Sequence, residues 1–411
     1  MRKIDALTKS PEFYSSDTIV DASRFGPPPY APTDLPPEKN ERRWTRRALL
    51  LGSGVLLGAL GMGGGYAAYN AYFAPAPATL PTAPRAQPTI SKAQPTSTQG
   101  AMLTKARLQA TFTRHTQTVR GVAWSPGGAL LASGADDGHL FSWSTDGVLQ
   151  HTFSHFQPVR AVAWSPDGNR LVAASGNQIL FYNGLSGARL AQSGQGHRQR
   201  VNSVAWSTHG QMYVVSGGVD RRAVVWDSVL YRPLITFELH TTSIDVVALS
   251  TDGQSVASAS QGGAVRVWNA ANGEELHGYY QDADVPARAL SWSPGTAHLA
   301  VGSDDGFVHI WDNGLRCQNQ RGQGNTAICM DTPQSLRIAQ TAVRALAWSP
   351  DGHYLAAGTD DGVCSVWSLA RPQKALLTIR PGAPVLSLAW SPDSSKLATA
   401  SGKTIGIWAL S

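Results

Sequence analysis

Residues 160–168 read RAVAWSPDG, and variants of this stretch recur along most of the chain. The core of the motif, Val-Ala-Trp-Ser-Pro, returns at intervals of 40, 42, 43, 43, 56 and 42 residues. Its aromatic position is held by Trp124, Trp164, Trp206, Leu249 (Leu replacing Trp), Trp292, Trp348 and Trp390. Alternating apolar residues followed by a Ser-Pro-Asp-Gly turn indicate a short strand and a tight turn. A repeat near 42 residues built from such strands is typical of the blade of a β-propeller.

A second aromatic residue follows each motif by 18 to 20 residues. It is Trp143, Tyr182, Trp226, Trp268, Trp311, Trp367 or Trp408. Twelve of the 13 tryptophans therefore occupy two repeated positions, which explains why this chain has more Trp than Phe. In the second unit the pattern predicts strands over residues 160–164, 170–174 and 178–182. The sequence predicts an all-β fold, a seven-bladed β-propeller of four-stranded antiparallel blades, over residues 105–411.

These repeats resemble the WD-repeat (WD40) family, and the resemblance covers about three quarters of the 411 residues. In that family a His before the first strand, a hydroxyl on the second, an Asp in the next turn and the third-strand Trp form a buried hydrogen-bonded set. The resemblance implies complete sets in blades 1 and 3 and partial ones elsewhere; blade 4, for example, has Gly262 at the Asp position. The implied structural residues are His115, Asp137 and Trp143; His197, Asp220 and Trp226; Asp305 and Trp311; and Asp361 and Trp367.

The last unit lacks an outer strand, because only three residues follow Trp408. Residues 107–113 alternate in polarity and resemble the outer-strand segments 148–153 and 233–237. We expect the segment 105–114 to complete the last blade, which would join the two ends of the domain and remove an exposed sheet edge.

The first 104 residues divide into three segments. Residues 1–47 are rich in Pro, Ser and charge, which predicts a disordered tail. Residues 48–73 carry no charge, and about 20 apolar residues suffice to cross a bilayer as a helix. Residues 74–104 are rich in Pro, Ala and Thr, which predicts an extended stalk. We therefore expect a single transmembrane signal-anchor helix over residues 48–73.

The basic residues on either side predict the orientation of this helix. Four arginines lie between residues 42 and 47, and the next basic residue after the segment is Arg85. The positive-inside bias places the N-terminus in the cytoplasm and the propeller outside it. Residues 45–50, TRRALL, also resemble a twin-arginine export signal, so the alternative is export followed by cleavage and release. The spacings of Gly54 with Gly58 and of Gly61 with Gly65 would allow a weak helix-mediated dimer.

Charge and motifs argue against nucleic-acid binding and against catalysis. Residues 105–411 hold 23 basic and 21 acidic side chains, so we expect no nucleic-acid partner despite the net charge of +6. The sequence contains no G-x-S-x-G, H-E-x-x-H, P-loop or Cys-x-x-Cys motif. The histidines His115, His155, His197 and His240 each occupy one repeat, which favours a structural role over a metal site. We expect no enzyme, no cofactor and no metal.

The loops that enter the first strand, and the turns between the second and third strands, carry uneven charge. The basic residues there are Arg198, Arg200, Arg221 and Arg222, and the acidic ones are Asp136, Asp282, Asp284, Asp304 and Asp360. This distribution predicts a polarised face for docking protein partners, with ordinary solvated loop charges as the plainer interpretation. The predicted function is a non-catalytic scaffold for protein partners outside the cytoplasm. The alternatives are a receptor for small ligands or glycans and a propeller enzyme.

One unit is longer than the others, with an insertion at residues 313–331 that contains Cys317 and Cys329. In an oxidising compartment a disulfide between them would stabilise the fold by about 3 kcal/mol, whereas two free thiols are the alternative. Cys364 aligns with valines of the third strand, so we expect a buried, inert thiol.

Overall fold

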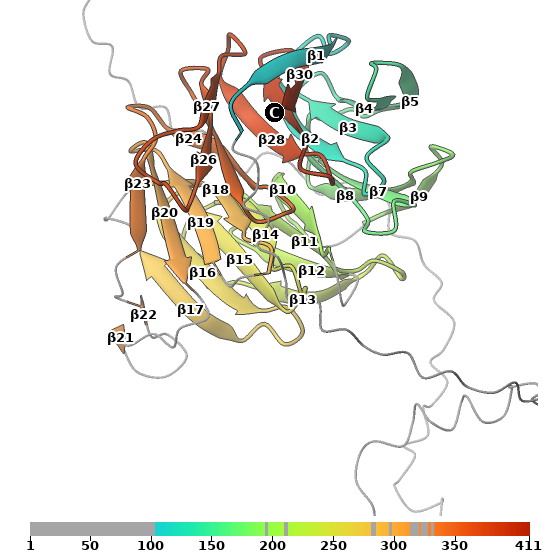
Figure 1. Ribbon diagram of the computed structural model, residues 1–411. Coiled ribbons are helices and arrows are strands. Elements are labelled where there is room, and N and C mark those ends of the chain that lie inside the picture. The colour runs from blue at the N-terminus through green and yellow to red at the C-terminus, as the bar shows by residue number, and fades with distance from the viewer. Residues whose placement is uncertain are drawn as a thin grey trace, which may run out of the picture. The chain divides into compact units, whose positions relative to one another are not determined.

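The computed structural model describes residues 103–193, 196–208, 213–280, 285–295, 298–312 and 333–411, together with the backbone of 320–321 and 328–329. The predicted seven-bladed propeller is confirmed. Seven β-sheets lie around a common axis, and each contains four antiparallel strands that run outward in order from the axis (Figure 1). Blade 1 begins with β2, and the numbering of the blades follows the chain.

The strands of the seven blades are short and regular. The inner strands are β2 (Val119–Trp124), β6 (Val159–Trp164), β10 (Val201–Trp206), β14 (Ile244–Leu249), β18 (Ala287–Trp292), β24 (Val343–Trp348) and β28 (Val385–Trp390). The second strands are β3 (Leu130–Ala135), β7 (Arg170–Ser175), β11 (Tyr213–Gly218), β15 (Ser255–Ser260), β19 (His298–Ser303), β25 (Tyr354–Thr359) and β29 (Lys396–Ser401). The third strands are β4 (His139–Ser144), β8 (Gln178–Asn183), β12 (Ala223–Asp227), β16 (Ala264–Asn269), β20 (Phe307–Asp312), β26 (Cys364–Ser368) and β30 (Thr404–Leu410). The outer strands are β5 (Leu149–Ser154), β9 (Arg189–Gln192), β13 (Pro233–Phe237), β17 (Glu275–Tyr280), β23 (Gln334–Arg337), β27 (Leu377–Ile379) and, in blade 7, β1 (Ala106–Phe112).

The Ser-Pro-Asp-Gly sequence makes the turn between inner and second strands. In blade 2 the amide of Arg170 donates to the hydroxyl oxygen of Ser165 at 2.8 Å, and the amide of Gly168 donates to the Ser165 carbonyl at 2.9 Å. Gly168 has a φ of 70°, a conformation that glycine adopts without a steric penalty. The same turn, closed by an amide that donates to the Ser carbonyl three residues earlier, recurs in blades 1, 4, 6 and 7.

The hydrophobic core consists of seven clusters, one at each seam between neighbouring blades. At the seam between blades 2 and 3, for example, Ile179 and Phe181 pack with Val204, Trp206 and the blade 3 third strand. Because every cluster draws on two blades, no blade buries its apolar faces alone.

Aromatic stacking reinforces several of these seams. Phe237 at the end of β13 stacks on Trp268 of the next blade, with ring centroids 4.7 Å apart and an angle of 2°. Tyr279 of β17 stacks on Trp311 of blade 5 at 4.3 Å. Phe112 of β1 stacks on Trp143 at 4.4 Å and 7°. The repeated Trp of the third strand is therefore a contact between blades as well as within one.

The ring closes through β1 and β30, which lie far apart in the sequence and side by side in space (Figure 1). Their antiparallel register runs from Ala106 opposite Leu410 to Phe112 opposite Ile405. The carbonyl of Ser411 also accepts the amides of Thr104 at 2.6 Å and Lys105 at 2.8 Å. The sequence predicted this outer strand over residues 107–113, and the structure has it over 106–112.

The insertion departs from the predicted four-stranded pattern. It lies between β20 and β23, and it contains β21 (Gln320–Arg321) and β22 (Ile328–Cys329). β22 pairs in parallel with β17 at Gly278, so the sheet of blade 4 has six strands instead of the four expected. This edge was open for pairing because the backbone of an outer strand has unused hydrogen-bonding groups.

Several predictions fall on residues outside those that the structure describes. These are the tail, the transmembrane segment 48–73, the stalk up to residue 102, and the side chains of Cys317 and Cys329. In the part of the chain that the structure does describe, no helix has the length and apolar character needed to span a membrane. Cys364 lies in β26 and is fully buried, and burial raises the pKa of its thiol to about 12.

The seam between blades 7 and 1 predicts that Phe112 is needed for a stable ring. Phe112 is 2% exposed, and replacing it with Ala removes both the Trp143 stack and part of the core cluster. We expect Phe112→Ala to lower the free energy of unfolding by about 3 to 5 kcal/mol in urea denaturation. Leu108→Ala on the same strand is the control, because Leu108 is 47% exposed and should cost under about 1 kcal/mol. Equal losses from the two variants would contradict this closure.

Candidate docking face and central channel

Two sets of loops come together on one side of the ring. They are the loops that enter each inner strand and the turns between second and third strands. Backbone hydrogen bonds join them: the amide of Asp136 donates to the carbonyl of Thr118, and that of Val219 donates to Arg200, both at 2.9 Å. We call this side the upper face. Its described loops are residues 113–118, 136–138, 155–158, 176–177, 196–200, 219–222, 238–243, 261–263, 285–286, 304–306, 338–342, 360–363, 380–384 and 402–403.

Histidine–aspartate contacts hold these two loops together in blades 1 and 3. His115 Nδ1 lies 3.0 Å from Asp137 Oδ2, and His197 Nδ1 lies 3.0 Å from Asp220 Oδ1. Burial lowers the pKa of His115. Burial alone would raise the pKa of Asp137, but hydrogen bonds from the backbone amides of His139 and Thr116 outweigh it and lower that pKa. Blade 1 therefore keeps a neutral imidazole against a carboxylate.

The complete four-member set is present in blade 3. Ser216 Oγ lies 2.7 Å from His197 Nε2 and accepts the indole N–H of Trp226 at 2.7 Å. Four buried polar groups thus satisfy one another in one chain of hydrogen bonds.

The prediction of a complete hydrogen-bonded set in blade 1 is wrong for one of its four residues, Trp143. His115 Nε2 lies 2.9 Å from Ser133 Oγ, but the indole N–H of Trp143 has no hydrogen-bond partner among the described residues. Its ring instead stacks on Phe112 of the neighbouring blade. Stacking does not itself prevent the hydrogen bond, since Trp268 of blade 4 stacks on Phe237 and also donates its indole N–H to Ser258 Oγ at 3.1 Å.

Blades 5 and 6 have partial sets. Asp305 accepts the hydroxyl of Ser303, and Asp361 accepts the hydroxyl of Thr359. Within the described residues, the indole N–H groups of Trp311 and Trp367 find no acceptor. In these two blades the aspartates hold the turn and do not reach the tryptophans.

The basic residues predicted for docking lie where expected on the upper face. Arg198, Arg200 and Arg221 are exposed, whereas Arg222 forms an ion pair with Glu238 at 2.6 Å. Arg198 and Arg221 belong to the two loops of blade 3 that Asp220 connects, because Asp220 Oδ2 also accepts the amide of Arg198 at 2.8 Å.

The predicted acidic half of the face is not free. Asp136 pairs with Arg120 at 2.6 Å, Asp304 with Arg288 at 2.7 Å, and Asp360 with Arg344 at 2.7 Å. Each arginine stands 16 residues before its aspartate, at the second position of the inner strand. The other two predicted acidic residues, Asp282 and Asp284, lie outside the described residues. Asp136, Asp304 and Asp360 therefore line the rim of the channel as ion pairs and are not free to form an acidic docking surface.

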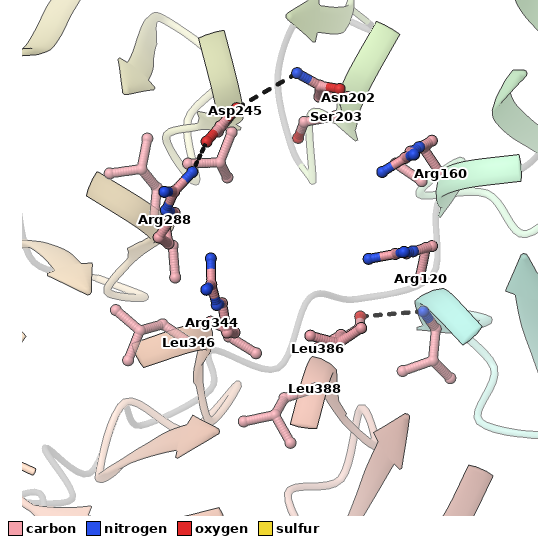
Figure 2. Close-up of a pocket in the computed structure, with 18 of the residues that line it drawn as sticks. Arg120, Arg160, Asn202, Ser203, Asp245, Arg288, Arg344, Leu346, Leu386 and Leu388 are labelled. Carbon is pink, nitrogen blue, oxygen red and sulfur yellow. Dashed lines mark hydrogen bonds and ion pairs between the residues drawn. The ribbon is translucent and has the colours of Figure 1, made fainter. Parts of the chain in front are cut away.

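The second positions of the inner strands line the central channel (Figure 2). In chain order they are Arg120, Arg160, Asn202, Asp245, Arg288, Arg344 and Leu386. The cavity that they enclose with their neighbours has a volume of about 290 Å³. Polar groups make up most of the second positions, and Leu346 and Leu388, which also line the cavity, lie two residues further along β24 and β28.

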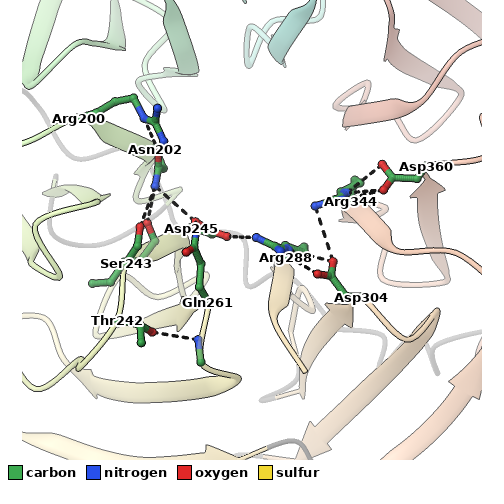
Figure 3. Close-up of polar contacts among 12 residues, drawn as sticks. Arg200, Asn202, Thr242, Ser243, Asp245, Gln261, Arg288, Asp304, Arg344 and Asp360 are labelled. Carbon is green, nitrogen blue, oxygen red and sulfur yellow. Dashed lines mark hydrogen bonds and ion pairs between the residues drawn. The ribbon is translucent and has the colours of Figure 1, made fainter. Parts of the chain in front are cut away.

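A continuous chain of polar contacts runs along this rim from blade 3 to blade 6 (Figure 3). Arg200 bonds Asn202 at 3.1 Å, and Asn202 reaches Asp245 at 3.4 Å. Arg288 bridges Asp245 and Asp304, and Arg344 bridges Asp304 and Asp360. Hydrogen bonding to Asp304 raises the pKa of Arg288, and bonding to Asp360 raises that of Arg344. Single repeats give no sign of this network, which appears in the sequence only when the second positions of all inner strands are compared.

Within the described residues, no group of three His, Cys, Asp or Glu side chains is arranged to hold a metal ion. The fold and this rim define a closed propeller with a polar channel and a loop-bearing face.

The chain belongs to the WD40 family, described as WD domain, G-beta repeat. The family matches residues 106–144, 147–183, 189–227, 231–269, 274–312, 333–368 and 374–409.

Similar curated proteins come from animals, plants and fungi. The LST8 homolog of Drosophila melanogaster is 28% identical over 43% of this chain and 54% of its own length. The small ribosomal subunit protein RACK1y of Oryza sativa subsp. japonica is 29% identical over 38% of this chain and 44% of its own. Autophagy-related protein 16 of Arabidopsis thaliana is 26% identical over 56% of this chain and 43% of its own. The chain thus matches about half the length of these relatives.

The incomplete set of blade 4 predicts a specific pH dependence. His240 Nε2 lies 2.7 Å from Ser258 Oγ, but its Nδ1 is buried without a partner among the described residues because Gly262 replaces the aspartate. Burial lowers the pKa of His240 to about 3. A folded-state pKa below the unfolded value means that stability is present above about pH 6.5 and is lost as the pH falls toward 3.

Gly262→Asp should supply the missing partner, raise the pKa of His240 and reduce that loss. Between pH 7.5 and 5 the His240 contribution amounts to about 2 kcal/mol, and the variant should recover most of it in urea denaturation. The Thr242 hydroxyl lies 3.1 Å from the new Cβ position, so it must shift slightly. Gly262→Asn has the same size without the charge and is the control. If both variants showed the wild-type pH dependence, His240 would not be the titrating group.

Proposed function

We propose that this chain is a non-catalytic docking platform, anchored in a membrane by residues 48–73, whose upper face binds protein partners outside the cytoplasm. The observation that carries the docking proposal is the pair of exposed arginines, Arg198 and Arg221, on the two connected loops of blade 3. Neither forms an ion pair within the described residues.

Rigidity supports this proposal. The Asp220 contacts with His197 and with the amide of Arg198 fix the blade 3 loops before any partner arrives. Ordering of interface loops normally opposes association, so loops that are already ordered bind with a smaller entropic cost. Exposed charge on such loops orients the approaching partner and raises the rate of encounter.

Membership of the WD40 family supports the same conclusion. One relative is named as a protein of the small ribosomal subunit, which is an assembly of many components. As part of the proposal, we infer that this chain likewise assembles with other macromolecules. Anchoring rests on the sequence alone: an uncharged segment of 26 residues preceded by four arginines.

Charge reversal on the upper face tests the docking proposal. After chemical cross-linking in its own cells and purification, the Arg198→Glu/Arg221→Glu chain should lose protein partners that the wild type captures. Arg232→Glu/Lys374→Glu is the matched control, because both residues are exposed and lie in loops between third and outer strands, on the other side of the ring. Mass spectrometry should show wild-type partners with the control. If the upper-face variant retained every partner, the docking site would not lie on the blade 3 loops.

Protease treatment of intact cells tests the orientation. An added protease that cannot cross the membrane should degrade the propeller and leave residues 1–47 protected, because the arginines hold the N-terminus inside. Immunoblots with tags at the two ends of the chain distinguish the two parts. Full protection of the propeller would contradict the orientation, and loss of the propeller into the medium without protease would indicate the cleaved, exported form.

A further inference from the structure

The mouth of the central channel holds more arginine than its aspartates can neutralise. The charged residues there are Arg120, Arg160, Arg200, Arg288 and Arg344 on the basic side, and Asp136, Asp245, Asp304 and Asp360 on the acidic side. All four aspartates are engaged by three of the arginines: Arg120, Arg288 and Arg344. The remaining two, Arg160 and Arg200, lie together on the side of blades 2 and 3.

Arg160 is the outlier of this set. It projects from β6 into the channel beside Arg120, and no contact joins it to the residues drawn around it (Figure 2). Its Nε is buried and has no hydrogen-bond partner among the described residues. Burial lowers the pKa of Arg160, and the nearby charges of Arg200 and Arg120 lower it further. Arg160 is half-buried and forms no ion pair among the described residues. Partial burial of such a cation is costly, and a bound anion would offset that cost.

We propose that the channel mouth between blades 1 and 3 binds a phosphate group, with Arg160 as its central ligand and Arg200 and Arg120 beside it. The guanidinium fork matches the spacing of phosphate oxygens and donates paired hydrogen bonds. Five arginines against four aspartates leave the mouth with one positive charge in excess. Arg160 and Arg200 form no ion pairs among the described residues, so both are available to donate to one phosphate group. A cavity of about 290 Å³ admits a group of this size.

Two kinds of ligand carry such a phosphate group: the free phosphate ion and a phosphorylated side chain of a protein partner. The proposal goes beyond the docking function and does not depend on it, because neither Arg198 nor Arg221 lines the channel mouth. An ion pair within the chain would compete with phosphate for Arg160. Asp136 pairs with Arg120 through Oδ2, but its Oδ1 is buried without a partner among the described residues. A rotation of Arg160 toward that oxygen would pair Arg160 within the chain and leave no site.

Calorimetric titration of the full-length chain with sodium phosphate at pH 7.5 and constant ionic strength tests the proposal. We expect saturable binding by the wild type and a loss of about ten- to a hundredfold in affinity for Arg160→Gln. Arg200→Gln should weaken binding, whereas Arg198→Gln, two residues away and outside the mouth, should bind as the wild type does. Absence of saturation, or equal weakening by Arg198→Gln, would overturn the proposal.

Thermal unfolding shows whether Arg160→Gln loses phosphate binding only because the variant is misfolded. Phosphate should raise the unfolding midpoint of the wild type and not that of Arg160→Gln, since a ligand stabilises only the state that binds it. Without phosphate the variant should be at least as stable as the wild type, because it lacks a half-buried cation that forms no ion pair among the described residues. A strongly destabilised variant would show instead that Arg160 pairs internally and would contradict the site.

Three further ligands separate the sources. Tighter binding of a phosphoserine peptide than of inorganic phosphate, dependent on Arg160, supports a partner's side chain as the source. Equal binding of the two supports the free ion. Acetate, and the same peptide with Glu in place of phosphoserine, should bind at least tenfold more weakly. If they matched phosphate, the assignment of a phosphate group as the ligand would be wrong.

Discussion

The pairing of β1 with β30 is the constraint on which the rest of the structure depends. Blade 7 obtains its outer strand from the segment before blade 1, in a register that runs from Ala106 opposite Leu410 to Phe112 opposite Ile405. The same strand places Phe112 against Trp143, so it also forms part of the seam between the last and first blades. One segment thus covers a sheet edge and completes the seventh core cluster, and the geometry of the channel follows from that closure.

The ring relies more on its apolar seams than on its buried polar sets. Every seam has a hydrophobic cluster, whereas the full set of four hydrogen-bonding groups joins only in blade 3 among the described residues. In the part of the chain that the structure describes, His240 Nδ1 of blade 4 and the indole N–H of Trp143 in blade 1 have no hydrogen-bond partner. Packing between blades tolerates these losses because each cluster is shared by two sheets. The polar sets have a second use, since they hold the loops of the upper face in place.

The repeat made the architecture predictable from the sequence, and the limits of that prediction have physical causes. Seven motifs and their spacing identified the blades, and the alternating segment at 107–113 identified the missing outer strand. The rim network was not predicted, because ion pairs such as Arg344 with Asp304 join different blades and depend on the curvature of the ring. Asp136, Asp304 and Asp360 therefore seemed available for docking although arginines of the channel neutralise them. The pairing of β22 with β17 was also missed, since two short segments of the insertion carry no strand pattern of their own.

Native-state hydrogen exchange tests the closure most directly. If β1 is an integral strand of blade 7, the amides of β1 and β30 should exchange only through global unfolding, with the same free energy as those of β3 and β4. Exchange of β1 amides at a much lower free energy, while β3 and β4 remain protected, would show that the ring persists without its closing strand. That result would contradict the account.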